Sequence, residues 1–115
     1  MAKRRKRRPR QPVATSEYAD AEGNVLTLRQ SLSPGTIRKI GEPPRSGAAT
    51  AEDAWRRRTE MLFERLAVRW EIAGLPIDDQ AMLIGRYRMA DAETQRWVQK
   101  TISRHLEEHI PELSG

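Results

Sequence analysis

Cysteine is absent from the 115 residues of this chain, and its absence excludes three kinds of chemistry. Without cysteine there is no disulfide framework, no thiolate metal site and no cysteine nucleophile. The composition fits a reducing compartment, and we expect a cytoplasmic protein. No apolar run approaches the roughly 20 residues that cross a bilayer, and the basic start lacks the apolar stretch of a signal peptide. The sequence therefore predicts no membrane association.

The sequence also lacks the patterns of an enzyme active site. It contains no phosphate-binding glycine loop and no Ser/His/Asp arrangement around a nucleophile turn. The HLEEH stretch satisfies the H-x-x-E-H pattern of zinc peptidases, with His105 and His109 as ligands and Glu108 as base. That chemistry needs another protein ligand and a substrate cleft, and the nearest downstream acid is Glu112. We predict a protein that is not an enzyme, with no catalytic residues, no cofactor and no bound metal.

Positive charge is concentrated in one short stretch. Residues 1–12 hold seven bases and no acid, residues 13–49 hold four of each, and residues 50–115 hold ten bases and twelve acids. The whole basic excess of the chain therefore lies in its first twelve residues. A domain that binds nucleic acid through its own surface usually carries a basic face. The charge distribution thus favours the basic tail that contains residues 1–12, and not the body formed by residues 50–115, as the site of contacts with nucleic acid.

Residues 1–12 have the composition of a segment that binds polyanions. A block of like charge without apolar residues stays disordered until a polyanion neutralises it. The alternatives are a solubilising end without a partner and a nuclear-import signal. We expect non-specific contacts with nucleic acid, DNA or RNA, from Lys3, Arg4, Arg5, Lys6, Arg7, Arg8 and Arg10.

Residues 1–22 are predicted to form this disordered basic tail, and residues 23–49 an extended arm, a short helical turn and a Pro/Gly linker. Residues 25–28 favour an extended segment, and Ser33 can cap a helical turn that begins at Pro34. Because no partner strand is visible, we expect the arm to lie across a helical domain or to pair with another subunit. A ribbon-helix-helix DNA-binding protein is the alternative.

Residues 50–115 carry helical patterns, from which we predict three helices over about 51–73, 79–88 and 92–109. Thr50, Asp78 and Asp91 are the expected N-caps. The predicted fold class is all-α, a small three-helix bundle that follows the tail and the arm. The core face of the first helix is expected to contain Trp55, Thr59, Leu62, Phe63, Leu66, Trp70 and Ala73, with Leu66 and Trp70 as anchors.

A second apolar stripe on the same predicted helix suggests a partner-binding surface. Met61, Val68 and Ile72 cluster within a narrow sector, separated from the core face by arginines. Contact with a protein partner or a homodimer would cover the stripe. The alternative is that the other two helices wrap far enough around the first to bury it.

Two functions remain open from the sequence. The first is a small interaction protein whose helical body binds a protein partner or itself, and whose tail binds nucleic acid. The alternative is a helix-turn-helix DNA-binding regulator built from residues 79–88 and 92–109. A continuous basic face over Arg86, Arg88, Arg96, Lys100 and Arg104 would favour the regulator.

Overall fold

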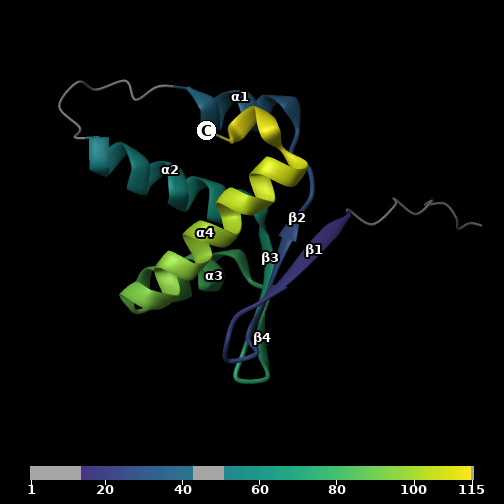
Figure 1. Cartoon of the computed structure of the whole chain (residues 1–115), viewed down its shortest axis with the longest axis vertical. Coiled ribbons are helices and arrows are strands. Elements are labelled where there is room, and N and C mark those ends of the chain that lie inside the picture. Colours follow the sequence, from purple (N-terminus) through teal and green to yellow (C-terminus); the bar gives the residue numbers. More distant parts are fainter. Residues whose placement is uncertain (1–13, 43–50, 115) are drawn as a thin grey trace, which may run out of the picture.

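The computed structural model describes residues 14–42 and 51–114. Two strands are followed by two helices, and this order then repeats along the chain (Figure 1). The elements are β1 (Thr15–Ala19), β2 (Val25–Arg29), α1 (Pro34–Gly41), α2 (Ala51–Leu66), β3 (Ala67–Ile72), β4 (Leu75–Ile77), α3 (Gln80–Met89), α4 (Ala92–His109) and a final 3₁₀ turn, η2 (Pro111–Leu113).

The four strands form one antiparallel sheet in the order β1-β2-β3-β4. The turn between β1 and β2 is held by Asp20, whose carboxylate accepts hydrogen bonds from the backbone amides of Glu22 and Asn24 at 2.8 and 3.0 Å. Asn24 in turn accepts the backbone N–H of Ala73 at 3.0 Å through its side-chain oxygen. This single side chain therefore ties the first hairpin to the turn of the second.

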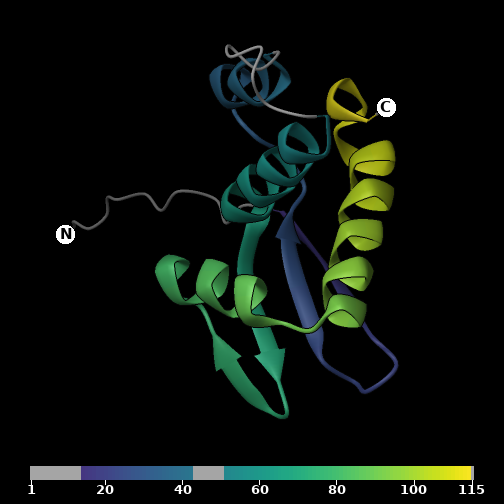
Figure 2. The same ribbon diagram turned by 90° about the vertical axis from the view of Figure 1, so that its left-hand side faces the viewer.

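Three helices cover one face of the sheet. In Figure 2, α4 lies beside β2 and in front of β1, while α3 lies in front of β3 and α2 lies above α3. No described element covers the opposite face, where Glu17 of β1 and Arg69 of β3 are exposed. The molecule is therefore a two-layer structure, helices on sheet.

The core lies between these two layers. Leu26, Leu28 and Trp70 point from the central strands toward the helices and are at most 1% exposed. Phe63 of α2 stacks on Tyr87 of α3 with a ring-centroid distance of 5.0 Å and contacts Trp70 edge-on at 5.8 Å. The remaining buried apolar side chains come from every helix, from the start of β3 and from the end of the chain: Ile40, Leu62, Leu66, Ala67, Leu83, Ile84, Val98, Ile102, Leu106, Ile110 and Leu113.

The all-α prediction is wrong, because the described residues include a four-stranded sheet. The predicted helix over 51–73 ends at Leu66, and the chain continues directly into β3. Leu66 and Trp70 are four residues apart, a spacing that suits one helix face as well as it suits the helix end and strand seen here. Both are buried, as predicted for the anchors, but Trp70 reaches the core from a strand that pairs with Leu26 of β2.

A hairpin turn stands where the helix predicted over 51–73 was expected to end. Ala73 and Gly74 have φ angles of 52° and 80°, and Ile72 pairs with Leu75 across them. Two successive residues with positive φ make a type I′ turn, the form that suits the twist of a two-residue β-hairpin.

The arm prediction is also corrected. Residues 25–28 are extended, as expected, but β2 pairs with β1 and β3 of the same chain. Residues 15–19, assigned from the sequence to the disordered tail, form β1. Ser33 caps α1 and Asp91 caps α4 as predicted, whereas α3 is capped by Asp79 and not by Asp78.

Candidate functional site

The outward face of α4 carries a set of exposed basic side chains. Val98, Ile102 and Leu106 turn toward the core, because residues three and four apart share one side of a helix. The side chains on the other side therefore project outward. Arg96, Lys100 and Arg104 follow one another at intervals of four residues there, and all three are exposed.

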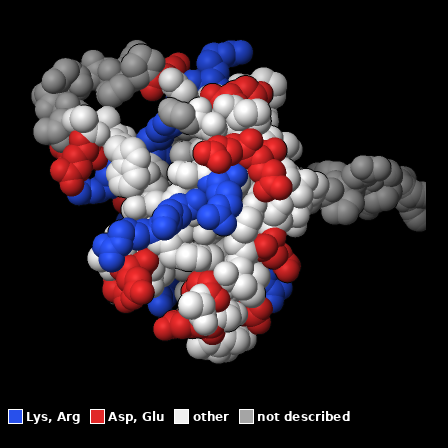
Figure 3. All heavy atoms as spheres, viewed as in Figure 1, with Lys and Arg blue, Asp and Glu red and all other residues white. Residues whose placement is uncertain are grey.

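These three cations form a row, which we call the basic row. Figure 3 shows basic side chains running across the molecule over α4, with acidic groups near both ends. At a rise of about 1.5 Å per residue the row is about 12 Å long. None of the three takes part in an ion pair with the other described residues. They are therefore available to an external anion.

The basic row lines an open groove of about 760 Å³ between α4 and the start of α2. Two tryptophans take part in its walls. Trp55 is 52% exposed, so the prediction that it belongs to the core is wrong. Trp97 is half-buried, with part of its side chain packed on the core. The remaining lining residues are Glu93, Gln99, Ser103 and Glu107.

The groove combines cations with aromatic faces, but its charge is not uniform. Glu93 precedes Arg96 by three residues and Glu107 follows Arg104 by three, so an acid flanks each end of the row. Gln99 donates to the Tyr87 hydroxyl at 3.0 Å. The groups that can meet a ligand therefore include the three cations and the exposed parts of the two rings.

The basic face that would favour a helix-turn-helix regulator is only partly present. Arg88 donates to the Glu60 carboxylate at 2.9 Å, which raises the pKa of Arg88 and pairs its charge with an acid. Gln95 donates to the backbone carbonyl of Tyr87 at 3.0 Å and is not free to read a base edge. The basic face therefore reduces to the row on α4, while Arg86 of α3 remains exposed.

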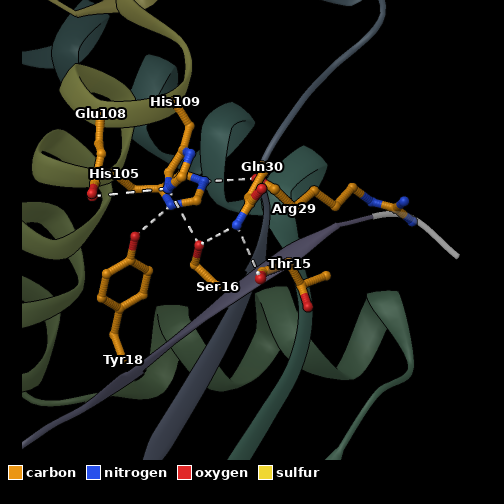
Figure 4. A network of polar contacts seen from close by, with 8 residues as sticks. All are labelled: Thr15, Ser16, Tyr18, Arg29, Gln30, His105, Glu108 and His109. Atoms are coloured by element: carbon orange, nitrogen blue, oxygen red, sulfur yellow. Dashed lines mark hydrogen bonds and ion pairs between the residues drawn. The ribbon is translucent and has the colours of Figure 1, made fainter.

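A second candidate is the polar network between β1 and the end of α4 (Figure 4). His105 is fully buried, and its Nε2 lies 2.6 Å from the backbone carbonyl oxygen of Arg29. A carbonyl can only accept, so Nε2 carries the proton and Nδ1 accepts from the Tyr18 hydroxyl at 2.7 Å. Burial lowers the pKa of His105 and raises the pKa of Tyr18. Both groups are therefore held neutral.

His109 stands beside this pair but does not complete a catalytic triad. Its Nε2 lies 3.3 Å from the Ser16 hydroxyl and 3.8 Å from the Glu108 carboxylate. In a triad the acid must hold the opposite ring nitrogen from the one that faces the nucleophile. Here Ser16 and Glu108 share the same nitrogen. The network therefore joins β1 to α4, and its geometry is not one that activates the Ser16 hydroxyl as a nucleophile.

The same geometry bears on the HLEEH stretch. Both ring nitrogens of His105 are already engaged, so ligation of a metal would break a buried hydrogen bond. Within residues 14–42 and 51–114, no three His, Asp or Glu side chains are grouped to hold an ion.

The predicted partner-binding residues do not lie on one helix. Met61 is on α2, whereas Val68 and Ile72 are on β3, so the stripe inferred from helical periodicity does not exist. Met61 and Ile72 are half-buried and pack on the core. Met61 lines a hollow of about 440 Å³, and Val68 lines a separate hollow of about 150 Å³. Glu64 and Arg65 take part in the lining of both.

The predicted nucleic-acid contacts of the tail, residues 3–10, lie outside the described part of the chain. From the sequence, Arg96, Lys100 and Arg104 were expected only as part of a recognition helix, and Trp97 carried no prediction. The available signal was the tryptophan between Arg96 and Lys100, a mixture of aromatic and basic residues that is typical of nucleic-acid contacts.

Comparisons with known proteins supply no family for the chain. No family model matches it, and neither a curated protein nor a solved structure shows a significant match. Among the described helices, none has the length and apolar character to cross a membrane.

Proposed function

We propose that this protein binds nucleic acid without sequence specificity, through the basic row of α4 together with the basic tail. The observation that carries the proposal is the row itself, three exposed cations without ion-pair partners among the described residues. A continuous line of unneutralised cations is the electrostatic footprint of a phosphate-backbone contact.

Charge elsewhere supports the same assignment. Residues 50–115 carry two more acids than bases, so the row is a local feature and not the average of the surface. Residues 1–12 add seven more bases. The described chain begins beside the end of α4, where Ser16 of β1 contacts His109 at 3.3 Å. The first described residue, residue 14, therefore lies toward the Arg104 end of α4, and we expect one polyanion to contact both the row and residues 1–12.

Phosphate contacts position a ligand but do not read its sequence. Gln95 and Gln99, the side chains on α4 best suited to reading adenine, are engaged with Tyr87. The proposal is therefore sequence-independent binding, and duplex recognition by a helix-turn-helix is the competing function.

Salt titration of binding to a fluorescent oligonucleotide tests the proposal. Each phosphate contact contributes roughly −0.7 to −0.9 to the slope of log affinity against log salt. Lys100→Gln should weaken binding to all sequences alike and reduce the slope by about 1. Arg69→Gln removes the same charge from the uncovered face of the sheet and is the matched control. Deleting residues 1–12 should remove up to about seven contacts.

Equal effects of the two single substitutions would show that only total charge matters, and the row would lose its role. Strong preference of the full chain for one duplex sequence, lost on substitution of Lys100, would replace the proposal by the helix-turn-helix function.

A further inference from the structure

The two tryptophans of the groove present ring surface on which a ligand with a flat apolar face can stack. Trp55 lies near the start of α2 with 52% of its surface exposed, next to Arg56 and Arg57, which are also exposed. Covering so large an exposed apolar ring with a ligand would remove apolar surface from water, which favours binding. Trp97 packs partly on the core, so its position is held before any ligand arrives.

The groove offers a line of cations together with these two rings. A ligand that uses both must carry repeated negative charges and planar groups at a regular spacing. Single-stranded nucleic acid has this chemistry, because every nucleotide has a phosphate and an unpaired base with a free face. A duplex stacks its bases on one another and offers their edges, not their faces, to a protein groove.

We infer that the groove binds single-stranded nucleic acid, with phosphates on Arg96, Lys100 and Arg104 and bases stacked on Trp55 and Trp97. The inference rests on the proposed function and adds the ligand class. The row is about 12 Å long, which corresponds to about three or four nucleotides at the stacked rise of 3.4 Å per nucleotide. Both DNA and RNA strands satisfy this chemistry.

The acids at the ends of the row determine how far the strand can extend on α4. Glu93 and Glu107 lie in the same groove, and like charge raises the cost of placing a phosphate beside them. Replacing Glu107 with glutamine should therefore tighten binding, and the effect should shrink as salt increases.

The test compares the affinity of the protein for a 12-nucleotide oligothymidylate with its affinity for a DNA duplex of equal length. Oligouridylate of the same length serves as the RNA strand. Binding to the single strand should quench tryptophan fluorescence from the exposed rings, while Trp70, which is 1% exposed, contributes an unchanged background. Trp55→Ala should weaken single-strand binding about 10-fold, and Trp55→Phe should restore most of it, because a ring is kept. Leu75→Ala is the control, because Leu75 is 71% exposed and belongs to β4.

The outcomes separate the inference from the function on which it rests. If the duplex binds as tightly as the single strand and Trp55→Ala changes neither affinity, while Lys100→Gln still weakens both, the inference fails and the proposed function stands. If none of the nucleic acids binds with a salt-dependent affinity, both fail.

A protein ligand gives a different result. Polyglutamate carries repeated charge without bases, so it should compete only weakly and should be insensitive to Trp55→Ala. Displacement of the oligonucleotide by polyglutamate at equal charge concentration would overturn the assignment of the groove to nucleic acid. Circular dichroism of every variant checks that the fold is retained before its affinity is interpreted.

Discussion

Acidification should destabilise this fold through His105. The imidazole is fully buried, its Nε2–H donates to the Arg29 carbonyl, and its Nδ1 accepts from Tyr18. Only the neutral ring can do both. Protonation would place a second N–H against the Tyr18 hydroxyl and a charge in the core, which is why burial lowers the pKa of His105.

The sign and size of the effect follow from proton linkage. In the unfolded chain the histidine titrates near its ordinary pKa of about 6.5. Because the pKa in the folded state is lower, the unfolded state binds more protons between the two values. The contribution is therefore fully present above about pH 6.5 and is lost as pH falls, by at most about 1.4 kcal/mol of unfolding free energy per pH unit. The loss levels off below the folded-state pKa.

Urea unfolding followed by intrinsic tryptophan fluorescence, to which the buried Trp70 contributes, measures this dependence between about pH 7.5 and about pH 5. His105→Leu should lower stability at every pH, because it leaves the Tyr18 hydroxyl and the Arg29 carbonyl without their partner. It should also flatten the pH dependence. His109→Gln removes the neighbouring ring and should keep most of the slope, because burial and not the charge of His109 is the main cause of the lowered pKa of His105. An equally steep slope in the His105→Leu protein would refute the assignment to this residue.

Two further changes test the fold. Ala73→Asn should stabilise the protein by about 0.5–1 kcal/mol, because asparagine tolerates the positive φ of this position and forms the favoured Asn-Gly turn with Gly74; a lower thermal midpoint would contradict the turn assignment. Leu66→Ala should cost about 2–5 kcal/mol, since Leu66 is fully buried. Leu75→Ala, at an exposed position, should stay within about 0.5 kcal/mol of the parent, and equal losses for both would show that the core is misplaced.

Local signals were read correctly where a short-range interaction decides the outcome. Ser33 and Asp91 cap their helices because a side-chain oxygen needs only a backbone N–H three residues later, here that of Thr36 or Thr94. α4 spans the predicted residues 92–109 because both its cap and its apolar period are local. The burial of Leu66 and Trp70 was also evident from the pattern, since either secondary structure places these residues in the core.

The choice between helix and strand for residues 67–72 was not local. Their apolar positions satisfy a helical period, and the strand forms because its backbone pairs with β2, where Trp70 meets Leu26. That partner lies more than forty residues earlier in the sequence. Since β-propensity depends on the neighbouring strands and on burial, a single segment does not carry the decision.

Some features of the candidate site likewise follow from the sequence alone, and others only from the tertiary structure. The amino-acid sequence by itself determined the concentration of bases in residues 1–12, the absence of cysteine chemistry and the interval of four that aligns Arg96, Lys100 and Arg104. Only the tertiary structure brought Trp55 beside that row and engaged Gln99 with Tyr87. The physical reason is that charge and helical period are properties of the chain, whereas a groove exists only where two separate helices pack on a common sheet.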